Sequence, residues 1–303
     1  MHDLRVVVRP PFAFRLPALS GMDGLLRVRE GVVRRLVCDP AGRPAVVRAA
    51  HAGADVLISA RADQLETARW GVERLRFALG VDEDLRAFHE RFRHDPLIGP
   101  ALRADRGWRP PRRPAVFEAF AWAVCEQLIE FERAAAIQRR LVARWGHSHA
   151  GLRDAPPAAA LARAAPAELQ SCDLAAARAV ALRRAAGHFA AGRATPRRLA
   201  GVPGIGSWTL AITALLGEGR ADAVPAGDLH LRKLVGRARS GGDPRARAGQ
   251  EEVLAFFDPY APYGGLAALV TMRLGLTTAR PPRAPAPAGT RWSARRRDPS
   301  RPG

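Results

Sequence analysis

The segment from Leu199 to Leu210, LAGVPGIGSWTL, constrains the fold more than any other part of the chain. Two glycines flank Ile205, and because glycine has no Cβ they let the backbone turn sharply and come close to a ligand. Apolar residues recur at helical spacing on both sides, which predicts one helix ending near Ala200 and another beginning near Ser207. The free N–H groups and the positive end of the second helix form a natural seat for phosphate. The residues expected to bind phosphate are Val202, Gly204, Ile205, Gly206, Ser207 and Thr209.

The composition favours a folded chain with a polyanionic partner. Of 303 residues, 48% are hydrophobic and 25% charged, so a sizeable core is possible and wholesale disorder is excluded. The formal charge of +19 favours nucleic acid, because basic side chains that neutralise phosphates dominate such affinity. Lys233 is the only lysine, and the abundance of Ala, Arg, Gly and Pro offers a compositional explanation instead. The charge alone therefore does not decide between a DNA-binding and a protein-binding hairpin.

The cysteines and the hydropathy exclude several classes of site. Cys38, Cys125 and Cys172 are far apart and form no C-x-x-C pair, which predicts free thiols in a reducing cytosol and neither a disulfide framework nor a metal site. No stretch reaches the roughly 18 apolar residues that a membrane span needs. We therefore expect no membrane contact and a cytoplasmic protein associated with the nucleoid.

The chain begins with strands and continues with helices. Short apolar runs separated by turn residues predict strands within residues 1–80, with hairpin turns at Gly42 and Gly53 and a helix over Asp63–Leu79 that stops at Gly80. Apolar residues at three- and four-residue steps then predict a series of helices. The expected helical ranges are Asp82–Arg93, Val116–Trp145, Pro157–Ala164, Ala175–Ala190, Ser207–Leu216, Leu231–Ala238, Gln250–Phe257 and Leu266–Leu276.

With its surroundings, the segment resembles the helix-hairpin-helix DNA glycosylases, above all the bacterial 3-methyladenine DNA glycosylase II type. In that family an Asp precedes the next helix about twenty residues after the hairpin, and Asp228 lies 22 residues after Gly206 (228 − 206). The runs Phe117–Ile129 and Phe257–Tyr263 are similar to further family segments. The resemblance implies an α+β, mainly α fold, with two helical lobes behind an N-terminal antiparallel β-rich layer.

The same resemblance implies a division of the chain. The expected parts are an N-terminal β-rich domain (1–80), an outer helical lobe (81–112 plus 229–278), a central helical lobe (113–228) that holds the helix-hairpin-helix (199–210), and a disordered basic tail (279–303).

The implied reaction is hydrolysis of an N-glycosidic bond through an oxocarbenium-like sugar. The family match assigns Asp228 to stabilise that charge and orient a water. The alternative is a helix N-cap, because Asp228 directly precedes a helical run, and the two roles can coexist. Trp208 and Tyr260 match aromatic walls of the pocket that takes the flipped base, against the alternative of core packing. Gln127 and Leu128 match the wedge that fills the gap in the duplex, against the alternative of an ordinary exposed hydrophobe.

Glu126 departs from the family, which often has Gly at that position. Trp208 stands where bifunctional relatives carry a nucleophilic Lys, so the resemblance implies hydrolysis without strand cleavage. No Cys follows Asp228, and no metal or other cofactor is expected. The implied partner is double-stranded DNA containing damaged bases, bound by a monomer. Two alternatives stay open, namely a glycosylase for uracil or oxidised bases and a non-catalytic lesion sensor of the same fold.

Overall fold

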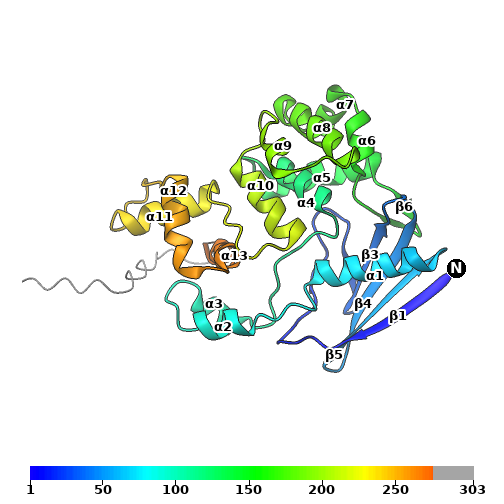
Figure 1. The fold of residues 1–303 in the computed structure, drawn as a ribbon, viewed down its shortest axis with the longest axis horizontal. Helices are drawn as coiled ribbons and strands as arrows, with labels where there is room; N and C mark the ends of the chain where they lie inside the picture. Colours follow the sequence, from blue (N-terminus) through cyan, green and yellow to red (C-terminus); the bar gives the residue numbers. More distant parts are fainter. Residues whose placement is uncertain (276–303) are drawn as a thin grey trace, which may run out of the picture.

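The computed structural model describes residues 1–275, so the basic tail predicted from Ala279 lies outside the described residues. The described chain begins with a sheet layer, shown at the right of Figure 1, and continues into helices. Helices α11 to α13 lie at the opposite side of the view, with α4 to α10 above and α2 and α3 below. The α+β, mainly helical fold predicted from the sequence is confirmed.

The N-terminal layer is a five-stranded antiparallel sheet in the order β1-β5-β4-β3-β2. Gly42 and Gly53 have φ of 80° and 66°, which confirms the two predicted turns. Val33, Ala49 and Ile58 are buried on the face that helix α1 covers (Figure 1), because alternate residues of a strand point to one face. The strands and this helix span His2–Val8 (β1), Arg27–Arg29 (β2), Val32–Cys38 (β3), Pro44–Ala52 (β4), Asp55–Ala62 (β5) and Leu65–Leu79 (α1).

The helical part contains the predicted helices and several short elements that the sequence did not reveal. Their bounds are Arg86–Phe92 (α2), Gly99–Ala104 (α3), Val116–Glu126 (α4), Phe131–Trp145 (α5), Ala158–Arg163 (α6), Pro166–Gln170 (α7), Ala176–Ala190 (α8), Pro196–Ala200 (α9), Ser207–Thr213 (α10), Leu229–Arg239 (α11), Gln250–Phe257 (α12) and Gly264–Gly275 (α13). A π turn (η1, Ala214–Glu218), a 3-10 turn (η2, Asp258–Tyr260) and a two-stranded hairpin (β6, Ser148–His149; β7, Leu152–Arg153) complete the described chain. The break between α4 and α5 exposes the loop from Gln127 to Glu130.

Three large hydrophobic clusters and a small one, of Leu36, Val46 and Leu152, hold these elements together. One lies between the sheet and α1, a second among α4 to α9, and a third among α2, α3 and α11 to α13. Leu25 of the N-terminal part packs in the second cluster, and Leu215 packs in the third. Segments at the predicted borders therefore share cores, and the division into three domains stays a prediction.

A buried charge cluster joins the sheet to the central helices. The Arg35 guanidinium of β3 lies 2.5 Å from the Glu118 carboxylate of α4 and 3.7 Å from Asp154. Beside them, Arg113 lies 2.6 Å from Asp23, whose carboxylate also accepts the Trp122 indole N–H at 3.0 Å. Burial lowers the pKa of Arg35, but the surrounding carboxylates outweigh it and raise that pKa. Arg35 therefore stays charged and fixes the sheet against α4.

Breaking one partner of this cluster should cost much more than replacing the pair. Glu118→Ala leaves a buried guanidinium without its nearest carboxylate, and we expect the free energy of unfolding to fall by about 3 kcal/mol. Combining Glu118→Leu with Arg35→Met should recover most of that loss, because apolar side chains of similar volume need no charged partner. Guanidinium chloride titrations of both variants check this, and a double variant weaker than Glu118→Ala contradicts it.

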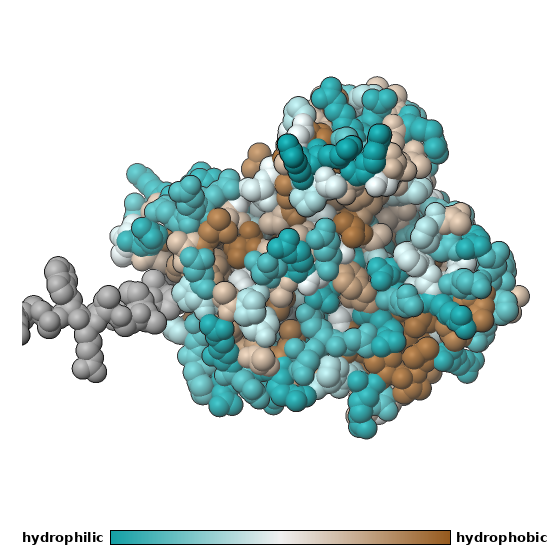
Figure 2. Space-filling model, viewed as in Figure 1, coloured by the Kyte–Doolittle hydropathy of each residue, from teal (hydrophilic) through white to brown (hydrophobic). Residues whose placement is uncertain are grey.

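The surface in the view of Figure 2 is mainly hydrophilic, with smaller hydrophobic patches. Among residues 1–275, no single helix is long and apolar enough to cross a membrane, and only the bent pair Gln250–Tyr260 with Gly264–Leu274, at 108°, has the length and composition. All three cysteines are free thiols; Cys125 and Cys172 are buried and Cys38 is half-buried.

Candidate functional site

The hairpin predicted from the sequence joins α9 to α10. Gly204 has φ of 88°, a left-handed conformation that strains any side chain with a Cβ, which explains the glycine there. Gly206 has an ordinary φ of −96°, and a Cβ built on it meets no atom within 4 Å. The protein's own packing does not require glycine at this second position. Its effect is to keep the outer surface of the hairpin open.

Most side chains around the hairpin are buried or hydrogen-bonded within the protein. Val202, Ile205 and Thr209 are buried, and the Ser207 hydroxyl lies 2.6 Å from the Gln250 side-chain oxygen of α12. The first backbone N–H of α10 with a helical acceptor is that of Leu210, which bonds the Gly206 carbonyl at 3.2 Å. The amides of the preceding helical residues therefore face outward from the first turn. The N–H groups of Val202 and Ile205, by contrast, already donate to the carbonyls of Leu199 and Val202, and phosphate binding at the hairpin stays a prediction.

Asp228 and Trp208 form a pair at the point where the hairpin meets α11. The Trp208 indole N–H donates to Asp228 Oδ2 at 3.2 Å. Asp228 Oδ1 accepts the backbone N–H groups of His230 at 2.8 Å and Leu231 at 3.2 Å, so Asp228 is also the N-cap of α11. The carboxylate is only half-buried. It is thus fixed by three hydrogen bonds and remains reachable from outside.

Gly227 allows this pairing. A Cβ at Gly227 would lie 3.1 Å from the Trp208 Cβ, so a larger residue would require Trp208 to shift by a few tenths of an ångström. The sequence did not reveal this role, because the two residues lie 19 positions apart (227 − 208) and only the fold brings them together.

The loop between α4 and α5 presents one exposed leucine. Leu128 is 94% exposed and has φ of 54°, which is uncommon for a leucine. The Gln127 side-chain amide turns inward and donates to the Gly204 carbonyl at 3.0 Å and to the Thr209 hydroxyl at 2.8 Å. Gln127 was predicted as part of the wedge, but the structure uses its amide to tie the loop to the hairpin. Leu128 alone projects outward.

Tyr260 lies in the core of the third cluster. Its side chain is 1% exposed, its hydroxyl lies 3.1 Å from the Asp95 carboxylate, and its ring packs against Phe92 and Phe257. Burial and the neighbouring Asp95 raise the pKa of Tyr260, so the hydroxyl keeps its proton and donates to that carboxylate. Of the two roles predicted for Tyr260, these contacts favour core packing. A ring so enclosed presents no free face to a base.

Glu126, the departure from the family pattern, is turned into the protein. Its carboxylate accepts a hydrogen bond from the Gln138 amide at 3.0 Å. Burial raises the pKa of Glu126, while Arg113 and this hydrogen bond act in the opposite direction. The carboxylate therefore does not project from the loop beside Leu128.

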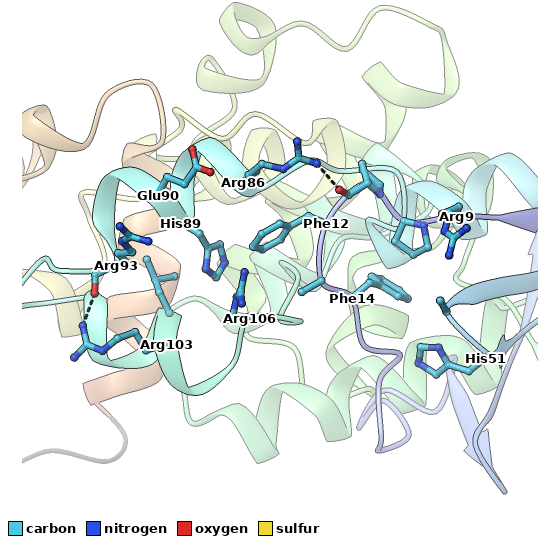
Figure 3. A pocket seen from close by; sticks show the side chains of 15 residues that line it. Arg9, Phe12, Phe14, His51, Arg86, His89, Glu90, Arg93, Arg103 and Arg106 are labelled. Atoms are coloured by element: carbon cyan, nitrogen blue, oxygen red, sulfur yellow. Dashed lines mark hydrogen bonds between the residues drawn. The ribbon is translucent and has the colours of Figure 1, made fainter.

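A pocket of about 720 Å³ lies elsewhere, between the N-terminal segment and α2 (Figure 3). Phe12, His89 and Arg106 gather at its centre, and it shares no residue with the hairpin, with the Gln127–Leu128 loop or with Asp228. In the part of the chain that the structure describes, no group of three or more His, Cys, Asp or Glu side chains could hold a metal ion.

Comparison with known proteins identifies the class. The model of the HhH-GPD superfamily base excision DNA repair proteins matches residues 121–258, and the AlkA N-terminal domain model matches residues 3–114. Two curated relatives, the probable bifunctional transcriptional activator/DNA repair enzyme AlkA of two Mycobacterium tuberculosis strains (CDC 1551 / Oshkosh and ATCC 25618 / H37Rv), are 30% identical over 264 residues. The alignment covers 76% of this chain and 49% of each relative, so the chain spans about half their length.

Solved structures share the fold. A 3-methyladenine DNA glycosylase from Archaeoglobus fulgidus superimposes with a TM-score of 0.74 at 19% identity, over 91% of this chain and all of that one. An 8-oxoguanine glycosylase/lyase from Clostridium acetobutylicum gives 0.61 at 13% identity, over 82% and 98%. The chain therefore belongs to the HhH-GPD superfamily of base excision DNA repair proteins, and its N-terminal domain is of the AlkA type.

The hydrogen bond between Trp208 and Asp228 should appear as a coupling energy. Trp208→Phe keeps the ring and removes the donor, and Asp228→Ala removes the acceptor. Because both side chains are partly exposed, we expect a coupling of about 1 kcal/mol in the unfolding free energies of a double-mutant cycle. Trp70→Phe, which removes a bond to the Cys38 carbonyl in the sheet layer, serves as the control and should add to Asp228→Ala without coupling. If the effects of Trp208→Phe and Asp228→Ala on the unfolding free energy simply add, that result contradicts the hydrogen bond between the two side chains.

Proposed function

We propose that this protein is a DNA glycosylase that flips alkylated purines, of the 3-methyladenine and 7-methylguanine type, out of duplex DNA and hydrolyses their N-glycosidic bond. The observation that carries the proposal is the half-buried Asp228 carboxylate, fixed by Trp208 and by the start of α11. The name of the Mycobacterium tuberculosis relatives, a DNA repair enzyme, supports the same class of reaction.

The duplex binds first through the hairpin and the loop of Leu128. Backbone amides at the start of α10 suit a phosphate, since the positive end of a helix favours an anion. Leu128 is suited to enter the stack where the base has left, because it is almost fully exposed and apolar. Gln127 links the two, so a duplex held at the hairpin meets a loop already in place.

The chemical step needs little acid catalysis, because an alkylated purine is cationic and leaves as a neutral base. The bond between the sugar C1′ and the base nitrogen breaks, and the electron pair leaves with the base. The Asp228 carboxylate stabilises the positive charge on the sugar and orients a water, whose oxygen bonds to C1′ while its proton goes to Asp228 or to solvent. The Trp208 ring offers a cationic base a stacking surface worth about 0.5–2 kcal/mol.

We propose further that the enzyme is monofunctional. An attacking amine is needed to form the covalent intermediate of a lyase, and the chain carries Trp208 where bifunctional relatives have lysine. Lys233, the only lysine, lies on α11 after Asp228. We also propose that the enzyme acts as a monomer and is located with its DNA substrate at the nucleoid.

Replacing Asp228 separates its two roles. Asp228→Asn keeps an oxygen for the helix cap, because Asn caps as well as Asp, but its NH₂ group replaces the oxygen that accepts the Trp208 indole N–H, so the unfolding free energy should fall by about 1 kcal/mol. Release of 3-methyladenine and 7-methylguanine from methylated duplex should fall by about 10²–10³-fold, since the stabilising charge is lost. Asp228→Ala should lose the same activity and about 1 kcal/mol more stability than Asp228→Asn, because it also lacks the helix cap.

The outcomes decide between the hypotheses. Full release by Asp228→Asn removes the catalytic assignment. Binding of damaged duplex by the parent without release of an alkylated base contradicts the proposal; release of uracil or an oxidised base would then indicate another lesion class, and no release at all a lesion sensor.

Replacing Leu128 by glycine should affect stability and activity in opposite directions. Leu128→Gly relieves the positive φ, so the free energy of unfolding should stay equal or rise by up to about 1 kcal/mol. Excision should fall about tenfold, equivalent to about 1.4 kcal/mol of the flipping energy. Val7→Ala, which shortens another exposed aliphatic side chain on β1, is the control and should leave excision unchanged. Loss of stability in parallel with activity contradicts a wedge.

A further inference from the structure

The face of the sheet opposite α1 carries a row of arginines that is interrupted only at Ser59 of β5. The antiparallel register places Arg27 opposite Arg34, and Arg34 opposite Arg48. Arg48 then lies opposite Ser59, and Ser59 opposite Arg5 on the edge strand. Directly opposed residues point to the same face, so the row crosses all five strands. We call these four arginines, Arg5, Arg27, Arg34 and Arg48, the arginine row.

The neighbouring row of residues shows how the two faces differ. Val33, Ala49 and Ile58, each one position along its strand from the arginine row, are buried against α1, which lies across that face in Figure 1. One face of the sheet is thus a packed core surface. The arginine row lies on the other face, where Arg5 and Arg27 are exposed and Arg34 and Arg48 half-buried.

The positive charge of the row is hardly compensated within the described residues. No ion pair is formed there by Arg27, Arg34 or Arg48, whereas Asp3 lies 3.3 Å from Arg5 and 3.5 Å from Arg61. Strand alternation also places Arg29, Arg61 and Asp55 on this face, which therefore carries six arginines against two aspartates, a net charge of +4 (6 − 2). Like charges directly opposite one another destabilise a sheet. The arrangement therefore lowers the stability of the sheet, and a bound anion would offset that cost.

Two local features agree with a surface that binds an anion. The Arg34 Nε atom is buried and has no hydrogen-bond partner in the described part of the chain. Burial, together with the charges of Arg34 and Arg61, lowers the pKa of Arg48, against the opposing effect of Asp3.

We propose that the arginine row is a second DNA-contacting surface, which binds the phosphate backbone without reading bases. Neighbouring strands are about 4.8 Å apart, so the row presents a line of positive charge nearly 20 Å long, and a duplex supplies closely spaced phosphates over that length. Guanidinium groups match phosphate geometry. The row shares no residue with the hairpin, Leu128 or Asp228. It therefore adds affinity for undamaged duplex outside the excision site.

The test measures binding of an undamaged 30-base-pair duplex across a range of KCl concentrations. The logarithm of affinity falls linearly with the logarithm of salt concentration, and each lost phosphate contact reduces the steepness of this fall by about 0.9. Arg34→Gln combined with Arg48→Gln should therefore reduce the slope by up to about 2 and weaken binding about tenfold near 0.1 M salt. The same variant should unfold at a higher denaturant concentration, because two opposed charges are gone.

The matched control is Arg69→Gln, which removes an exposed charge from α1 on the other face of the same sheet layer and should leave the slope unchanged. An unchanged slope in the folded Arg34/Arg48 variant overturns the proposal. A second result also overturns the proposal, namely that the substitutions weaken binding of polyglutamate and leave binding of the duplex unchanged. The partner of the arginine row is then an acidic protein. The proposal rests on DNA being the partner, as the proposed function has it. Its readout uses undamaged duplex, so failed excision with a reduced slope refutes the glycosylase and keeps the second surface.

Discussion

The structure depends on how helix α4 is held at its two ends. Near its start, Glu118 binds the buried Arg35 of the sheet, which fixes the N-terminal layer against the central helices. Directly after its end, Gln127 binds the hairpin through the Gly204 carbonyl and the Thr209 hydroxyl. The hairpin helix carries Trp208, and Trp208 holds Asp228. The buried ion pair, the exposed leucine and the carboxylate thus belong to one connected set of contacts, although they lie on distant segments.

Much of the fold follows from local sequence signals. Alternating strands, the turns at Gly42 and Gly53, and the hairpin glycine at 204 were predictable because their signals involve neighbouring residues. The short helices α3 and α7 escaped prediction, since five or six residues carry too little periodicity. The range Val116–Trp145 was predicted as helical with Leu128 at a helix end, and the structure divides it into α4 and α5 at the loop where Leu128 has a positive φ.

The sequence allowed single residues of the candidate site to be predicted, but not how those residues contact one another. Spacing and family resemblance pointed to Asp228 and Trp208, but their hydrogen bond and the close approach at Gly227 depend on the packing of two helices. The resemblance placed Gln127 in the wedge and left Tyr260 between a pocket wall and core packing. In the structure the Gln127 amide donates to the Gly204 carbonyl of the hairpin. The Tyr260 ring lies in the core, where its hydroxyl donates to the Asp95 carboxylate. The arginine row likewise needed the strand register.

The double use of the Asp228 carboxylate has an evolutionary consequence. One oxygen caps α11 and the other faces Trp208, so the helix depends on an oxygen at this position and not on its negative charge. Asp and Asn codons differ by a single nucleotide. A gene for this protein is therefore one point mutation away from a folded chain that keeps the proposed DNA-contacting surfaces without the charge. In terms of the proposed function, that single change leads from an enzyme to a protein that binds lesions without excising them.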